Sequence, residues 1–167
     1  MIHIYSKNKF FLKFLYQVLI NRGFYNFYLE LKDYIYFDIF LRCDVYERYY
    51  KNSNYVPSFS SYLKLGIKKI KSYLTKKNLL FKVNESLLID IGSGKGKILI
   101  LASFIGFKES IGIEKNVYLY KQCIKNIKKL KSTFGKCKNV KIYNQVANKF
   151  TLVDKLKNIG QGGGYKV

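Results

Sequence analysis

The most informative segment of this chain reads Leu87-Leu88-Ile89-Asp90-Ile91-Gly92-Ser93-Gly94-Lys95-Gly96. An apolar run ends in an acid and continues into three glycines at alternate positions, which is typical of a buried strand that ends in a tight loop. Glycine has no Cβ, so its backbone can turn sharply and approach a ligand closely. The residues from Lys97 to Ala102 can begin a helix, whose free N–H groups and partial positive charge suit a carboxylate or a phosphate.

A second apolar run, Ser110-Ile111-Gly112-Ile113, ends in Glu114. Glu114 follows Gly96 by 18 residues, which is about the spacing at which a second parallel strand presents an acid to ribose hydroxyls. Two vicinal hydroxyls offer two donors, and a carboxylate has two acceptor oxygens, so one glutamate can bind both. The two runs together predict a nucleoside site, although glycines after a strand also form plain turns and an acid at a strand end also caps helices.

Three kinds of nucleotide loop compete for this segment. A P-loop needs Ser or Thr after its Gly-Lys pair, but Ile98 follows Gly96-Lys97, so this type is excluded. A dinucleotide loop places its third glycine where Lys97 stands here. The third pattern, acid-x-Gly-x-Gly-x-Gly, matches Asp90 to Gly96 completely.

That pattern resembles the first motif of the class I methyltransferases that use S-adenosylmethionine (SAM), and Gly112-Ile113-Glu114 resembles the second motif. Phe37-Asp38 and Tyr55-Val56-Pro57-Ser58 also resemble segments of a bacterial branch of the family, while the two motifs alone resemble the non-SET lysine methyltransferases. The resemblance covers roughly residues 37–150. It implies SAM as cofactor and leaves the methyl acceptor open among small molecules, glycan precursors, proteins and RNA.

The resemblance also implies roles for single residues. Gly92, Ser93, Gly94 and Gly96 would lie against the methionine part of SAM, and Asp90 would hold its amino end. Glu114 would accept hydrogen bonds from both ribose hydroxyls. Tyr55 and Ser58 would lie near the cofactor. No catalytic residue can be named.

The fold class predicted is α/β, a partial Rossmann-like parallel sheet in the order 3-2-1. Strands are expected at 87–91, 111–114 and 140–145, and helices at 63–74, 97–105, 117–131 and 152–159. We divide the chain into a partly helical, aromatic extension (1–60), a SAM-binding domain (61–150) and a helix with a glycine-rich tail (151–167). Residues 24–48 alternate between helical and strand periods, so their structure stays open.

Two departures from the family pattern stand out. Val146 occupies the position where the family carries an acid that binds the adenine amino group, so Asn144 or Asn148 would have to replace it. The sequence also stops before the segment that corresponds to the fourth strand. We therefore expect a truncated protein, the front part of a methyltransferase, for which a second, complementing chain is one explanation.

Charge and cysteine content narrow the possible partners and the cellular location. The net charge is +21, but nearly all cations are lysines spread along the chain, which favours a solvated surface with weak attraction to nucleic acid or anionic membrane. Three cysteines without a C-x-x-C pair, and a single histidine, predict no metal site and no disulfide framework, and a cytoplasmic location. The apolar run from Phe10 to Ile20 is too short to cross a bilayer and predicts an amphipathic helix packed on the domain.

Two other hypotheses compete with a SAM-dependent methyltransferase. A basic nucleic-acid-binding protein without catalysis would explain the charge, and an inactive remnant would explain the early stop. The first predicts binding that weakens steeply with salt. The second predicts that the chain does not fold alone.

Overall fold

A three-stranded parallel sheet forms the centre of the computed structural model, which describes residues 2–46, 58 and 60–147, with the side chains from residue 12 onward. The strands are β1 (Leu87–Ile91), β2 (Glu109–Glu114) and β3 (Val140–Asn144), in the order β1-β2-β3. The predicted order is therefore confirmed. Because all strands run parallel, their carboxyl ends share one edge, where Glu114 pairs in register with Asn144.

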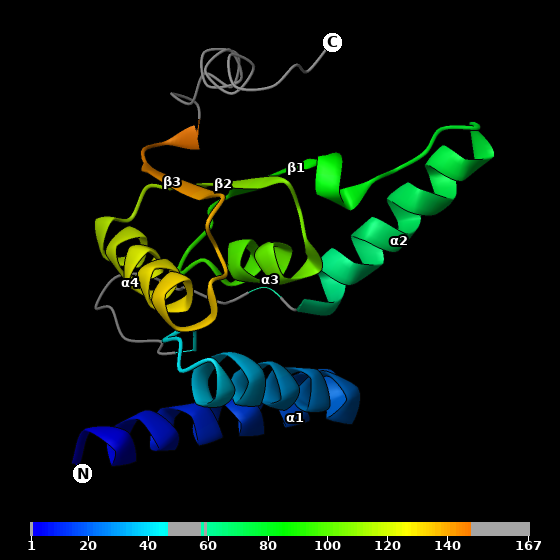
Figure 1. Ribbon diagram of the computed structural model, residues 1–167. Helices are drawn as coiled ribbons and strands as arrows, with labels where there is room; N and C mark the ends of the chain where they lie inside the picture. Colours follow the sequence, from blue (N-terminus) through cyan, green and yellow to red (C-terminus); the bar gives the residue numbers. More distant parts are fainter. Residues whose placement is uncertain (1, 47–57, 59, 148–167) are drawn as a thin grey trace.

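Two crossover helices cover one face of the sheet (Figure 1). Helix α3 (Lys97–Ile105) ends at Gly106, as predicted, with that glycine in the left-handed region at φ 98°. Helix α4 (Val117–Phe134) begins at Asn116, whose side chain accepts hydrogen bonds from the N–H groups of Tyr118 and Leu119. The fully buried side chains between sheet and helices include Leu99, Ile100, Ala102, Cys123 and Leu130.

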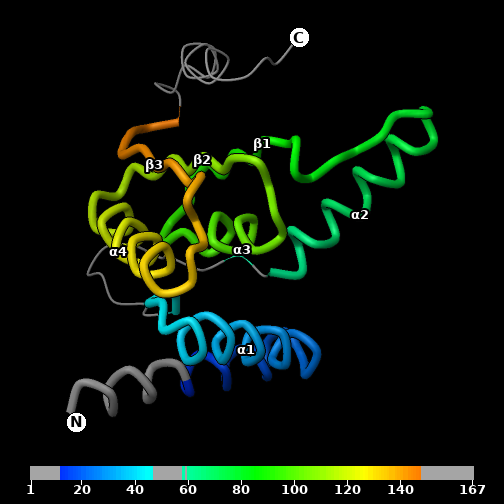
Figure 2. Tube along the Cα trace, viewed as in Figure 1, coloured from blue at the N-terminus to red at the C-terminus, as the bar shows by residue number. Residues whose placement is uncertain are grey.

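Of residues 24–48, whose period the sequence leaves open, 24–40 are helical, 41–46 form neither helix nor strand, and the last two lie outside the described residues. Helix α1 (Ile2–Tyr34) continues into the π-helical turn η1 (Ile35–Phe40). At Gly23 the backbone leaves helical geometry, with φ 79° and ψ 170°, and the chain doubles back so that two helical segments lie side by side (Figures 1 and 2). We call residues 2–40 the helical hairpin.

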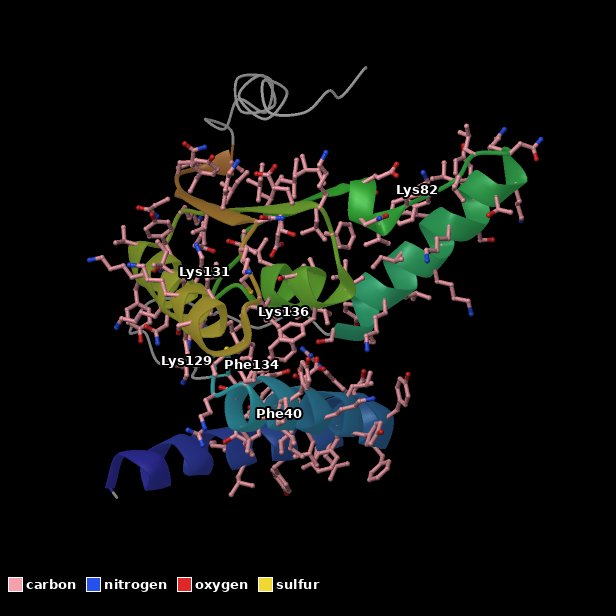
Figure 3. The ribbon with its side chains drawn as sticks, viewed as in Figure 1. Phe40, Lys82, Lys129, Lys131, Phe134 and Lys136 are labelled. Atoms are coloured by element: carbon pink, nitrogen blue, oxygen red, sulfur yellow. The ribbon has the colours of Figure 1, made fainter. Side chains whose placement is uncertain are left out.

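The helical hairpin packs beneath α3 and α4, on the side away from the sheet (Figure 1). Its buried residues Phe14, Leu15, Val18 and Phe37 join the same hydrophobic cluster as Leu99. The Phe40 ring stacks on the Phe134 ring with centroids 6.5 Å apart (Figure 3). The extension and the sheet thus share one core, whereas the division of the chain at residue 60 stays a prediction and the tail at 151–167 lies outside the described residues.

Helix α2 (Ser60–Lys76) confirms the helix expected over residues 63–74, and the short 3-10 turn η2 (Val83–Glu85) leads into β1. The Ser60 N–H donates to the Asp33 carboxylate at 2.9 Å, which ties the beginning of α2 to the helical hairpin. Within the described part of the chain, no helix combines the length and apolarity needed to cross a membrane.

Candidate functional site

Glu114, at the end of β2, holds the glycine loop (residues 92–96) against the sheet. Its side chain is only 6% exposed. One carboxylate oxygen, Oε2, accepts the Gly94 N–H at 2.8 Å, and the other, Oε1, accepts the Asn116 N–H at 2.7 Å. A carboxylate has about four lone-pair positions, so both oxygens keep the capacity to accept hydrogen bonds from a ligand.

The glycine loop directs most of its own N–H groups inward. The N–H groups of Gly92 and Ser93 donate to the Ile113 carbonyl at 2.8 and 3.1 Å, and the Gly96 N–H donates to the Ser93 carbonyl at 2.8 Å. The Ser93 side chain is buried, and its Oγ has no hydrogen-bond partner among the residues that the structure describes. The loop is therefore a preorganised turn fastened to β2, and α3 begins beyond it without a side-chain cap.

Two of the glycines serve different purposes. Gly92 has φ 76°, and a methyl group there would point into open space, so its backbone lies open to a ligand. Gly96 has φ 85°, and a methyl group there would overlap the Cys123 Sγ of α4. Gly96 is therefore required for close packing of the loop against α4, and its predicted contact with SAM stays a prediction.

We expect Gly96→Ala to lower the free energy of unfolding by about 3 kcal/mol. A left-handed backbone costs a residue with a Cβ about 1–2 kcal/mol, and overpacking of a tight contact costs about 1–3 kcal/mol more. Urea denaturation measures the loss. Gly106→Ala is the matched control, because Gly106 is also left-handed but has open space around it, so only the backbone cost should appear. Equal losses for the two variants would contradict the role of the Cys123 contact.

Asp90, at the end of β1, is a part-buried carboxyl without a partner among the described residues. Burial, together with the nearby Glu114 carboxylate, raises the pKa of Asp90 to about 6. The ion pairs of the described residues involve Asp33, Asp44, Glu85 and Glu109 but neither Asp90 nor Glu114. Two desolvated carboxylates without a counter-cation, in a chain with 31 Lys and Arg residues, favour a cationic ligand between them.

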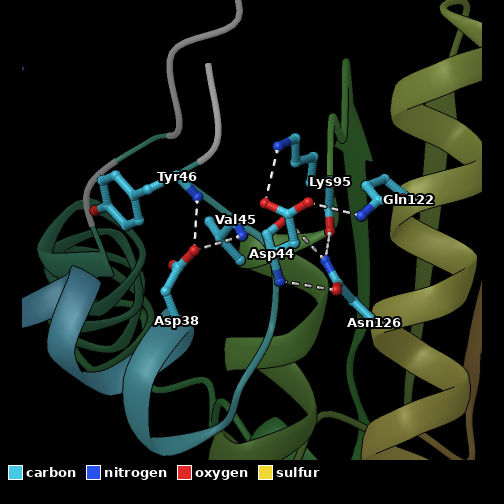
Figure 4. A network of polar contacts seen from close by, with 7 residues as sticks. All are labelled: Asp38, Asp44, Val45, Tyr46, Lys95, Gln122 and Asn126. Carbon is cyan, nitrogen blue, oxygen red and sulfur yellow. Dashed lines mark hydrogen bonds and ion pairs between the residues drawn. The ribbon is translucent and has the colours of Figure 1, made fainter. Parts of the chain in front are cut away.

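The two lysines of the loop region point toward the N-terminal extension and away from this edge. The buried Lys95 ammonium lies 3.3 Å from the Asp44 carboxylate, which also accepts the Gln122 amide at 2.7 Å (Figure 4). Asn126 completes the network, because it accepts the Asp44 N–H and donates to the Lys95 carbonyl. Lys95 therefore fixes the loop to residues that precede β1 by more than forty positions.

Lys97 forms a second buried link. Its ammonium lies 2.7 Å from the Asp33 carboxylate and 2.7 Å from the Tyr46 hydroxyl, and it stands 4.7 Å from the centre of the Tyr46 ring. Burial lowers the pKa of Lys97, while the Asp33 carboxylate opposes that shift. Lys97 stands where a dinucleotide-binding loop has its third glycine, and here it anchors the helical hairpin.

A hollow of about 350 Å³ adjoins the carboxyl end of β2. It is lined by Asn116, Val117, Tyr118 and Lys121, which form the first turn of α4 two to seven residues after Glu114. The hollow is an open surface depression and not an enclosed cavity. Sequence patterns gave no signal for this hollow, because it depends on how α4 leaves the sheet.

Of the other residues predicted to contact SAM, the described structure brings only Asn144 next to Glu114. Ser58 is exposed, and Tyr55 and Asn148 lie outside the described residues. The Asn144 amide donates to the carbonyls of Glu114 and Lys115 at 2.8 and 3.2 Å, so its amide is already engaged in holding β2 and β3 together. The proposed contacts of Ser58 and Tyr55 with SAM stay predictions.

Among known proteins, the chain is similar only to solved structures. No protein-family model matches the chain, and no curated protein matches it. The chain is similar to a candidate RNA methyltransferase from Pyrococcus horikoshii, with 17% identity, a TM-score of 0.36, and coverage of 52% of this chain and 38% of that one. It is also similar to a candidate protein-L-isoaspartate O-methyltransferase from Plasmodium falciparum, solved with S-adenosyl-L-homocysteine, with 22% identity, a TM-score of 0.47, and coverage of 87% and 67%.

Proposed function

We propose that this chain is a SAM-dependent methyltransferase, or the cofactor-binding part of one. The observation that carries the proposal is the pair of neighbouring carboxylates without a counter-cation among the described residues, Asp90 and Glu114, of which Glu114 also binds the glycine loop. SAM carries a positive sulfonium, a positive ammonium and two vicinal ribose hydroxyls, which are the groups that two such carboxylates can bind.

The residues present fit this ligand. Glu114 accepts hydrogen bonds from the ribose hydroxyls with its remaining lone pairs, and Asp90 accepts from the ammonium. The open backbone at Gly92 leaves room for the methionine part, and the hollow lined by Asn116 to Lys121 takes the adenine. When bound, SAM supplies a methyl group on a positively charged sulfur, so the protein contributes chiefly position and orientation.

The acceptor stays open among a small molecule, a glycan precursor, a protein and RNA, and a complementing chain is a further expected partner. We also propose a reducing, cytoplasmic setting. Cys43, Cys123 and Cys137 are free and buried, and burial raises the thiol pKa of Cys137, so these residues behave as small apolar side chains rather than as disulfide partners.

Titration calorimetry with SAM tests the proposal. The expected result is saturable binding of one SAM per chain in a sample that unfolds cooperatively. A folded sample that shows no heat of binding at millimolar SAM would overturn the proposal. Cooperative unfolding of the isolated chain would also count against the hypothesis of an inactive remnant.

We expect SAM binding to weaken about tenfold between pH 8 and pH 5. Asp90 has a pKa raised to about 6, so at pH 5 roughly nine in ten molecules would carry the neutral acid, which attracts an ammonium poorly. The sign follows because binding requires the deprotonated form, so affinity is full above about pH 7 and is lost as pH falls through 6. Calorimetry across this range measures the change.

The control for this pH dependence is Asp90→Asn, which cannot titrate at this position. Its affinity at pH 8 should resemble that of the unmodified chain at low pH, and its pH profile should be flat. A variant that keeps the full pH dependence would show that another group is responsible.

A further inference from the structure

The outer surface of the helical hairpin is apolar although it packs against nothing in the described structure. Leu12, Tyr16 and Ile20 follow one another at a spacing of four residues, so they share one face of the first segment. All three are more than 60% exposed, and Phe24 and Tyr25, just after the reversal at Gly23, are 72% and 70% exposed. Phe14, Leu15 and Val18 form the buried face of the same segment.

Exposed aromatic and aliphatic side chains at this density are unusual on a free surface. The helical hairpin is also the layer farthest from the sheet (Figure 1), with side chains that project away from the rest of the molecule (Figure 3). The surface is therefore available to a partner without rearrangement of the core.

The helical hairpin exposes its positively charged side chains and turns its acidic side chains inward. The cations with described side chains, Lys13, Arg22 and Lys32, are exposed. The acids Glu30 and Asp33 are buried, and Asp33 pairs inward with Lys97. Asp38 is also turned inward, because its Oδ1 accepts the N–H groups of Val45 and Tyr46 (Figure 4). The outer surface thus presents positive charge beside its apolar groups.

We propose that the outer surface of the helical hairpin binds an anionic lipid membrane surface. Its tyrosine, phenylalanine, leucine and isoleucine side chains would enter the boundary between headgroups and acyl chains, and its lysines and arginine would contact lipid phosphates. A second copy of the chain fits less well, because a symmetric contact would bring cations against cations with no acid to offset them. The net charge of +21 adds long-range attraction to such a surface.

Flotation of the full chain with lipid vesicles tests the proposal. Vesicles of phosphatidylcholine alone are compared with an equal mixture of phosphatidylcholine and phosphatidylglycerol at about 0.15 M salt. The expected result is binding to the mixed vesicles and at least tenfold weaker binding to the neutral ones. No binding to the mixed vesicles would overturn the proposal.

Paired variants test whether vesicle binding depends on the helical hairpin or only on net charge and exposed apolar surface. The triple change Tyr16→Ser, Ile20→Ser and Phe24→Ser should weaken vesicle binding at least tenfold. The control change Ile70→Ser, Tyr73→Ser and Leu80→Ser, at residues that are 47–79% exposed elsewhere on the chain, should change it less than twofold. Lys13→Ser with Arg22→Ser should weaken binding about 25-fold, at roughly fivefold for each cation. Lys125→Ser with Lys128→Ser on α4 removes the same charge and should have a small effect.

Each contrary pattern has a definite meaning. Equal losses for hairpin and control pairs would show that net charge alone drives binding and would overturn the proposal. If the chain sediments as a dimer and the triple hairpin variant sediments as a monomer, the surface binds a second copy of the chain. If RNA binding is weakened by the same variants, the surface binds nucleic acid. Either result would overturn the proposal. If the triple variant fails to unfold cooperatively, Ile20→Ser alone supplies the comparison, with at least a threefold loss expected and an unchanged affinity contradicting the proposal.

Discussion

Glu114→Gln should weaken SAM binding at least about 100-fold. A hydrogen bond to a charged acceptor is worth about 1.5–3 kcal/mol, and the glutamate is proposed to accept two of them from ribose. The glutamine amide keeps one acceptor oxygen but presents an NH₂ group to the N–H of Gly94 or of Asn116, both of which now donate to the carboxylate. Calorimetry measures the affinity, and urea denaturation should show an accompanying loss of about 1–3 kcal/mol.

The control for this variant lies at the other end of the same strand. Glu109→Gln removes a carboxylate that pairs with Lys141 at 2.6 Å, far from the glycine loop. Its SAM affinity should be unchanged. If both variants weaken SAM binding equally, or if Glu114→Gln binds normally while it remains folded, the proposed position of the ribose is wrong.

Lys97→Met should lower the free energy of unfolding by about 3–5 kcal/mol, because it removes one partner of a buried ion pair and leaves Asp33 without its cation. Glu30 lies in the same cluster: burial raises its pKa, and the Lys97 charge acts in the opposite direction. Loss of the lysine therefore leaves Asp33 without its ion pair and removes one of the two cations, Lys97 and Arg22, whose charges favour the ionised form of Glu30. Urea denaturation followed by circular dichroism measures the change.

The matched control is Lys82→Met, which removes a lysine from an exposed pair with Glu85 at 2.9 Å. Exposed pairs contribute about 0–1 kcal/mol, so this variant should unfold almost like the original chain. The double change Asp33→Leu with Lys97→Met should be less destabilised than Lys97→Met alone, because it removes the buried Asp33 carboxylate that Lys97→Met leaves unpaired. Similar losses for Lys97→Met and Lys82→Met would show that the buried pair does not anchor the helical hairpin.

The sheet and its crossover helices could be predicted because their signals are local. The apolar run at 87–91, the glycine at Gly106 and the apolar stripe of α4 each specify an element within a few residues, although α4 ends at Phe134 and not at the predicted residue 131. The parallel order then follows from alternating strands and helices. Asp90 and Glu114 could be placed at one edge for the same reason, since the carboxyl ends of parallel strands meet.

The helix predicted from the apolar run Phe10 to Ile20 is confirmed as part of the first segment of the helical hairpin. The second segment could not be predicted, because its aromatic residues satisfy helical and strand periods alike, and the choice between them is made by contacts with α3 and α4. The roles of Lys95 and Lys97 were missed for a related reason. Their partners, Asp44 and Tyr46, each lie 51 residues away in sequence, and no local pattern distinguishes a buried, paired lysine from a solvated one. A lysine flanked by core-forming residues at a loop–helix junction is the one signal that could have raised the question.

Titration of isotopically labelled protein with SAM, followed through its backbone amide resonances, tests the location of the cofactor most directly. The site described here predicts that the amides of residues 92–96 and 114–118 shift together and saturate at one SAM per chain, while those of α2 and the carboxyl end of α4 stay in place. Saturable shifts confined to another part of the molecule, or no shifts at millimolar SAM, would contradict a SAM site between Asp90 and Glu114.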